Sequence, residues 1–249
     1  MYGHHIQVLS LNDLNRSKVI KILERSFDGE FKVMDENTMC LFDISRYQID
    51  DLCSLIIQDN GRIYYSKLTT KVILEEFSES FQHFHYHTYM LASKHEYHQK
   101  IPYIIGDRCI IPLDGYTKKT VTWIVASNIA WKKDRVETNS VELVSQKNVV
   151  LKIGVHPSVF EKQLNRTTHL LKDLSQLFNI YMMAFRHKFR EIESNKTTII
   201  SEKLKENSYQ NSTTTMPEFI KDIDDYKTNQ IIQRLKNDGY ILEDEDIDY

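Results

Sequence analysis

Short apolar runs separated by polar turn residues occupy most of residues 30–155 of this chain. Runs that are rich in Ile, Val, Tyr and Phe and bounded by Asp, Asn or Gly are typical of β-strands. Polar turns at 106–107 and 146–148 each join two such runs, as in antiparallel hairpins. Residues 52–57 fit either a strand or a helix. The predicted strands are 31–34, 39–44, 63–65, 103–105, 108–111, 121–126, 141–144 and 149–153.

The N-terminal segment has a helical pattern instead. Residues 10–27 place Leu14, Ile20, Leu23 and Phe27 on one apolar face. Ser10 is the predicted N-cap, with Asp13 three residues later, and Asp28-Gly29 ends the helix.

Three further segments repeat their apolar residues at helical spacing. The segment 70–93 predicts a helix that faces the core. Pro157 suits the first turn of a long helix that continues to about residue 193, and Pro217 opens a short one. Between these last two helices the chain is polar and poor in aromatic residues, which is typical of a linker.

These elements predict an α+β protein. Its mainly antiparallel β core contains one embedded helix and is followed by a long helix after Pro157, with helical extensions at the N- and C-terminal ends. The expected divisions are an N-terminal helical extension at 1–29, a core at 30–194, a linker at 195–215, and a C-terminal helix with an acidic tail at 216–249.

Composition narrows the class of protein. Hydrophobic residues make up 41% of the chain, which is a globular value. Cys40, Cys53 and Cys109 form no Cys-x-x-Cys pair, so we expect a reduced, cytoplasmic protein. The first residues do not resemble an export leader, and no run approaches the roughly 20 apolar residues that a membrane span needs.

The formal net charge of −3 conceals an uneven distribution. Six acidic residues and no basic ones lie at 238–249, so the preceding part of the chain carries a formal +3. Between Gly115 and Lys172, ten basic residues face four acidic ones, a local excess of six positive charges. A local positive field attracts phosphate even when the total is acidic, although lysine-rich surfaces are also common as plain solvated faces.

Several short segments are weak signals one by one, but their order and spacing along the chain are informative when taken together. An extended segment, a polar turn and a Thr-led strand occupy 31–42, and a strand leading into a longer element occupies 60–73. The pieces that follow are Ile101-Pro102-Tyr103, Ile110-Ile111-Pro112-Leu113, Thr117-Lys118-Lys119, Trp123-Ile124 and Phe160-Glu161-Lys162-Gln163-Leu164-Asn165-Arg166-Thr167. In order and spacing, over roughly 140 residues, they resemble the ComK family, the competence transcription factors of Gram-positive bacteria.

The resemblance implies a nucleoid-associated, cytoplasmic activator of competence (DNA-uptake) genes. It implies binding to double-stranded DNA at AT-rich promoters, mainly through phosphate and minor-groove contacts, by an oligomer formed through self-association. RNA polymerase and a proteolytic adaptor are the further partners that it implies, and a membrane is not among them.

The strongest candidates for DNA contact are Lys118, Lys119 and Trp123. Two lysines, three small hydroxyls and an indole on adjoining turn and strand positions can supply phosphate contacts and an apolar wedge for a minor groove. Core packing is the alternative for Trp123, because Val121, Ile124 and Val125 surround it in the sequence.

A second aromatic and basic segment and the long helix supply more candidates. Trp131 is followed by Lys132, Lys133 and Arg135, a pattern that also fits an ordinary hairpin end. The long helix carries Gln163 on one side, with Lys162 and Arg166 available to a phosphate backbone. Structural use of Gln163 and Arg166 is the alternative, since long side chains often satisfy buried carbonyls.

Five histidines lie close together, and they suit more than one role: His83, His85, His87, His95 and His98. In a helix, His83 and His87 are one turn apart, a spacing that can hold zinc. Solvated or core-edge histidines, and phosphate or base contacts, are the alternatives. The ComK family has a Gly-Arg step near this point, which falls at Tyr86-His87 here, so His87 would keep a weaker, pH-dependent contact.

The chain has no Gly-x-Ser-x-Gly elbow, Walker loop or Gly-x-Gly-x-x-Gly, so we expect neither an enzyme nor a cofactor, and assign no metal site. Two alternatives to the DNA-binding activator stay open. One is a ComK-like interaction module that has lost DNA binding, which the acidic tail and the missing Gly-Arg step favour. The other is a metal-binding protein that uses the histidine cluster.

Overall fold

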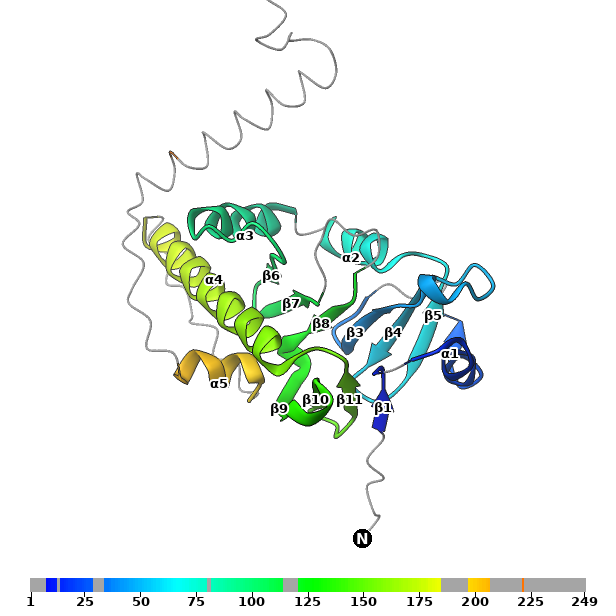
Figure 1. Cartoon of the computed structure of the whole chain (residues 1–249). Helices are drawn as coiled ribbons and strands as arrows, with labels where there is room; N and C mark the ends of the chain where they lie inside the picture. The colour runs from blue at the N-terminus through cyan, green and yellow to red at the C-terminus, as the bar shows by residue number, and fades with distance from the viewer. Residues whose placement is uncertain are drawn as a thin grey trace, which may run out of the picture. The chain divides into compact units, whose positions relative to one another are not determined.

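The computed structural model describes residues 8–12, 14–28, 34–79, 82–113, 121–184, 197–206 and 221 (Figure 1), and of residues 28, 79, 82–86 and 179–184 it describes the backbone alone. The chain divides into two compact units, Met1–Leu174 with Arg190–Tyr209, and Ser175–Phe189 with Gln210–Tyr249. Of the second unit, the described residues are 175–184, the end of helix α4, and Lys221. Both sheets lie in the first unit.

The larger sheet has seven strands in the order β2-β5-β4-β3-β8-β7-β6. All neighbouring pairs are antiparallel except β2 with β5. Every residue of β3 and β4 is buried, so both faces of the sheet centre are covered, which explains their nearly continuous apolar runs. The strands are β2 Phe27–Asp28, β3 Thr38–Asp43, β4 Ser54–Gln58, β5 Ile63–Ser66, β6 Tyr103–Ile105, β7 Arg108–Pro112 and β8 Trp123–Val125.

The smaller sheet has four strands in the order β1-β11-β10-β9. Strand β1 pairs with β11 in parallel, and the other two pairs are antiparallel. A β-bulge interrupts the β9–β10 register at Val144/Ser145. The strands are β1 Val8–Ser10, β9 Ile129–Arg135, β10 Ser140–Ser145 and β11 Val150–Ile153.

Five α-helices accompany the sheets within the described ranges: α1 Arg16–Leu23, α2 Thr70–Glu79, α3 Gln82–Lys94, α4 Pro157–Ala184 and α5 Ile199–Glu206. Short 3₁₀ helices occupy Ser45–Tyr47, Ala126–Asn128 and Val136–Thr138. None of the helices within these ranges combines the length and apolarity that crossing a bilayer requires.

The core between α2 and the larger sheet is built around Trp123. The indole is fully buried and meets the ring of Tyr103 edge-on, with ring centroids 5.5 Å apart. Leu41 lies opposite it on β3, and Ile73 and Leu74 contribute from α2. Burial of large apolar side chains such as these is the main favourable contribution to folding.

Helix α4 is tied to β7 by a buried amide. Gln163 Nε2 donates to the carbonyl of Lys100 at 3.0 Å and to that of Pro112 at 3.3 Å. Gln163 is 4% exposed, so these bonds satisfy carbonyls that water does not reach. The structural alternative for Gln163 is therefore confirmed.

The α+β class with a mainly antiparallel β core is confirmed. Strands β3, β5, β6, β7, β8, β10 and β11 lie where the apolar runs predict them, and the ambiguous residues 52–57 become β4. The long helix starts at Pro157 as predicted, and its expected continuation beyond residue 184 lies outside the described residues.

The N-terminal helix predicted at 10–27 is wrong in extent. Ser10 ends strand β1, and α1 begins after Asn15, whose Oδ1 accepts from the amide of Lys18 at 2.9 Å. The predicted apolar face is also wrong, because Ile20 and Phe27 are 39% and 58% exposed. Parallel pairing of β1 with β11, a contact distant in sequence, overrides the local pattern.

The expected linker at 195–215 contains helix α5, so this part of the prediction is wrong. Ile199 and Ile200 are buried. Thr198 and Ser201 cap the helix reciprocally, with backbone amide to hydroxyl distances of 2.8 and 3.1 Å. Residues 207–215 and most of the helix expected after Pro217 lie outside the described residues.

Three smaller differences remain. The single helix expected at 70–93 is two helices, α2 and α3. Strand β9 is absent from the prediction because most of its residues are polar. Of the strand predicted at 31–34, residues 31–33 lie outside the described residues, while Met34 is buried in the core without strand structure.

Candidate nucleic-acid interface

Strand β9 directs its basic residues to opposite faces of the smaller sheet. Successive side chains of a strand alternate between faces, so Trp131, Lys133 and Arg135 lie on one face and Lys132 on the other. The exposure follows the same division, since Lys133 is exposed and Lys132 is half-buried.

The register of the sheet places a second lysine on the face of Lys133. Lys133 lies opposite Glu142 on β10, and Glu142 lies opposite Lys152 on β11. Directly opposed residues share a face, so two lysines flank one carboxylate. Neither Lys133 nor Lys152 makes an ion pair among the described residues.

Arg135 completes the charge of this surface. Its guanidinium donates to Glu142 Oε2 at 2.9 Å. That hydrogen bond lowers the pKa of Glu142, burial opposes it, and the charges of Arg135, Lys133 and Lys152 lower it further, so the net shift is downward. Glu142 is therefore ionised at neutral pH. Three cations and one carboxylate leave an excess of two positive charges.

Trp131 adds an aromatic surface beside these charges. Its side chain is 47% exposed, on the same face as Lys133. An exposed indole next to cations can pack against deoxyribose or insert at a base step. We call the surface formed by Trp131, Lys133, Arg135, Glu142 and Lys152 the cationic face.

Lys132 has a structural role at the opposite face. Its ammonium lies 3.0 Å from Asp134 and 3.1 Å from Glu161 on α4. Lys203 on α5 also forms an ion pair with Glu161, so this carboxylate joins β9, α4 and α5. Lys132 is thus engaged within the protein on the face opposite Lys133, and its contact with DNA stays a prediction.

Trp123 is the main correction among the predicted site residues. A fully buried indole in the core cannot reach a DNA groove. The reason is its place in the fold, because β8 lies inside the larger sheet between β3 and β7. Core packing, the alternative, is confirmed for Trp123.

The candidates on α3 and α4 are dispersed. Lys162 is exposed on α4, whereas Arg166 is half-buried with its guanidinium 5.0 Å from the ring centroid of Tyr97. His87 is half-buried on α3, with the side chains of His83 and His85 outside the described residues. Lys162, Arg166 and His87 lie on helices and are not part of the cationic face. Lys118 and Lys119 lie outside the described residues.

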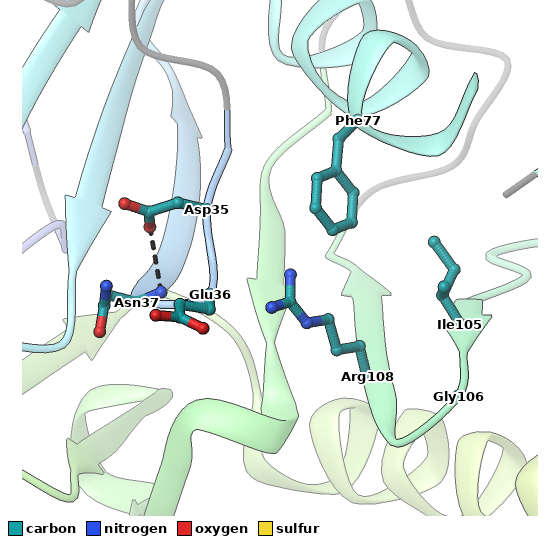
Figure 2. Close-up of a pocket in the computed structure, with 7 residues that line it drawn as sticks. All are labelled: Asp35, Glu36, Asn37, Phe77, Ile105, Gly106 and Arg108. Atoms are coloured by element: carbon teal, nitrogen blue, oxygen red, sulfur yellow. Dashed lines mark hydrogen bonds between the residues drawn. The ribbon is translucent and has the colours of Figure 1, made fainter. Parts of the chain in front are cut away.

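Figure 2 shows a pocket of about 640 Å³ on the larger sheet. Arg108 points into it, with its guanidinium 5.3 Å from the ring centroid of Phe77. The carboxylate of Asp35 accepts from the amide of Asn37 at 3.0 Å, which holds the turn before β3. The carboxylates of Asp35 and Glu36 line the pocket and would repel phosphate, so we do not include the pocket in the predicted DNA-contact surface. The lining residues are Asp35, Glu36, Asn37, Phe77, Ile105, Gly106 and Arg108.

Sequence reasoning identifies Lys133 and Arg135 but not Lys152 or Glu142. Lys152 and Glu142 could have been found from the pairing register of the predicted hairpin. The strands predicted at 141–144 and 149–153 place Glu142 directly opposite Lys152.

Comparison with known proteins identifies the family. The model of the family described as ComK protein matches residues 29–178, which include the larger sheet from β3 onward and every residue of the cationic face. No curated protein and no solved structure matches the chain. The match covers more than half of the sequence, and the chain therefore belongs to the ComK family.

Proposed function

We propose that this chain is a DNA-binding transcriptional activator of competence genes, and that the cationic face contacts the DNA backbone. Membership of the ComK family supports the competence assignment and a non-enzymatic role. The observation that carries the DNA contact is the row Lys133, Glu142 and Lys152, with Arg135 and the exposed indole of Trp131 beside it.

In this proposal the cations position the protein while the DNA supplies the selectivity. Lys133, Lys152 and Arg135 bind phosphates and release counterions, which favours any duplex. Trp131 lies against the sugars or wedges into the minor groove. AT-rich sequences are selected because their groove width and deformability suit this contact. Self-association, RNA polymerase and a proteolytic adaptor stay predicted partners, and the residues that stay predicted contacts are Lys118, Lys119, Lys132, Lys162, Arg166 and His87.

The test removes two charges from the cationic face. In the variant Lys133→Gln/Lys152→Gln the side chains remain long and polar, so folding should be preserved. We expect weaker binding to all duplexes and a reduction of the log Kd against log salt slope by about two units, at about 0.9 per phosphate contact. Fluorescence anisotropy with an AT-rich and a GC-rich duplex at several salt concentrations measures both effects.

A charge-matched control lies on another part of the molecule. Lys67, which precedes α2, is exposed, and Lys71, on α2, is half-buried; α2 lies apart from the smaller sheet (Figure 1). The variant Lys67→Gln/Lys71→Gln changes the net charge equally and should retain the slope. Equal slopes for wild type and the Lys133→Gln/Lys152→Gln variant would show that the cationic face does not contact phosphate.

The second candidate function is an interaction module that no longer binds DNA. Two sequence observations favour it, the acidic segment at 238–249 and Tyr86-His87 in place of the Gly-Arg step. It predicts that neither the wild type nor a variant that lacks the acidic segment shifts an AT-rich duplex, even at low salt. Binding at low salt that falls steeply as salt is raised would exclude it.

A further inference from the structure

Three potential metal ligands converge where the end of α3 meets α4. His95 follows directly after α3, and His169 and Asp173 lie one turn apart on α4. Residues at i and i+4 share a helix face, so α4 presents both side chains toward His95. One ligand atom from each residue lies within 4.8 Å of the others.

The distances are close to those of a coordination shell. His95 Nε2 and Asp173 Oδ2 are 2.5 Å apart, and the ring centroids of His95 and His169 are 4.2 Å apart. Ligand atoms around a tetrahedral zinc ion with bonds of about 2.0–2.1 Å are roughly 3.3 Å from one another. The His95–Asp173 pair is closer than this value and all three ligand atoms lie within 4.8 Å of one another, so the shell would form once that hydrogen bond opens around an ion.

The surroundings suit a bound cation. Asp173 is 4% exposed, and a buried carboxylate needs a positive partner. The side chain of His95 is 27% exposed, which leaves a route for an ion and a place for a water ligand. Among all the described residues, this is the one such cluster of three metal-ligating side chains.

A hydroxyl group orients one of the imidazoles. Tyr97 Oη lies 3.2 Å from His169 Nδ1. Imidazoles that bind a metal usually use one ring nitrogen while the other is held by an outer partner, and Tyr97 is in that position.

We propose that His95, His169 and Asp173 form a binding site for a divalent transition metal of the Zn²⁺ type, which joins the end of α3 to α4. Two imidazoles and one carboxylate are a ligand set that Zn²⁺ accepts, with water in the fourth position. The proposal does not require that the cationic face contacts DNA, and of the five clustered histidines the site uses His95.

Calorimetric titration of the metal-stripped full chain with Zn²⁺ tests the proposal. We expect one ion per chain for wild type and a loss of affinity of more than about 100-fold for His169→Gln, because even outer-shell changes cost about 10- to 100-fold. Tyr97→Phe should weaken binding about tenfold while retaining one ion per chain. Zn²⁺ should raise the Tm of wild type and leave that of His169→Gln unchanged.

Controls keep the outcome decisive. His98→Gln removes an exposed histidine three residues from His95 and should bind as wild type does. If His169→Gln fails to fold, His95→Gln replaces it, since its side chain is partly exposed. Absence of one-to-one Zn²⁺ binding by wild type, or an equal loss in His98→Gln, would overturn the proposal, whatever the DNA assays give.

Discussion

Glu142 lies between Lys133 and Lys152 and accepts a hydrogen bond from Arg135. Its carboxylate organises these side chains in the free protein. It also repels a phosphate that approaches the same face. One acidic side chain thus opposes the electrostatic attraction that three basic ones provide.

Glu142→Gln should therefore strengthen binding to DNA. A charge a few ångströms away is worth about 1 kcal/mol in water, which corresponds to an affinity gain of about fivefold at low salt. Arg135, released from the carboxylate, neutralises its phosphate more fully, so the salt slope should increase by at most about one unit. Anisotropy titrations beside wild type measure both quantities. Unchanged or weaker binding would mean that DNA lies elsewhere.

The two tryptophans show what sequence can and cannot reveal about single residues. Both lie beside lysines and apolar residues, so their local sequences are similar. Trp123 is nevertheless in the core and Trp131 at the surface. The difference arises from strand order, because β8 is internal and β9 is an edge strand, and strand order depends on contacts that are distant in sequence.

At the scale of elements, Glu161 joins β9, α4 and α5 through Lys132 and Lys203. Burial alone would raise the pKa of Glu161, but hydrogen bonds from Lys203 and Lys132 outweigh it and lower the pKa. The ion pairs of Glu161 therefore stabilise the folded protein at pH values above the ordinary carboxyl pKa. This stabilisation is lost as the pH falls through the lower pKa that Glu161 has in the folded state.

Glu161→Gln should lower the free energy of unfolding by about 1 kcal/mol at pH 7, a typical value for a charge-assisted hydrogen bond at a partly exposed site. The difference from wild type should shrink as the pH falls below about 4, when the carboxylate of wild type is protonated. Urea denaturation at a series of pH values measures this. A difference that does not depend on pH would indicate a packing effect instead.

The elements that sequence predicts well are those with strong local patterns. Apolar runs identify the strands of the larger sheet, and Pro157 identifies the start of α4. Strand β1 and helix α5 are missed because each is short and depends on distant partners, namely β11 for β1 and Glu161 for Lys203 of α5. Local patterns contain no information about such partners.

At the scale of the whole molecule, the acidic segment at 238–249 carries opposite charge to the cationic face. This segment is negatively charged, as DNA is, so it competes with DNA for the same basic surface. The two are covalently joined, so even weak competition acts at a high effective concentration.

Removal of residues 207–249 should therefore tighten DNA binding. The cut is placed after Glu206 because α5 belongs to the first unit, where it packs against β9 and the 3₁₀ helix Ala126–Asn128, and should be retained. A rough gain of three- to tenfold at low salt, disappearing at high salt, is expected from screened electrostatic competition. As a matched control, neutralising the segment by Asp→Asn and Glu→Gln changes should give the same gain. Equal affinity of full-length and truncated chains would reject this competition.

The strand spacing of the smaller sheet gives the cationic face a fixed width. One strand separates β9 from β11, so the backbones that carry Lys133 and Lys152 are about 9.5 Å apart. A duplex carries many phosphates on one rigid backbone, so it can occupy both lysines with separate phosphates at once. A linked set of charges therefore binds the cationic face more tightly than a mononucleotide or a free inorganic ion does.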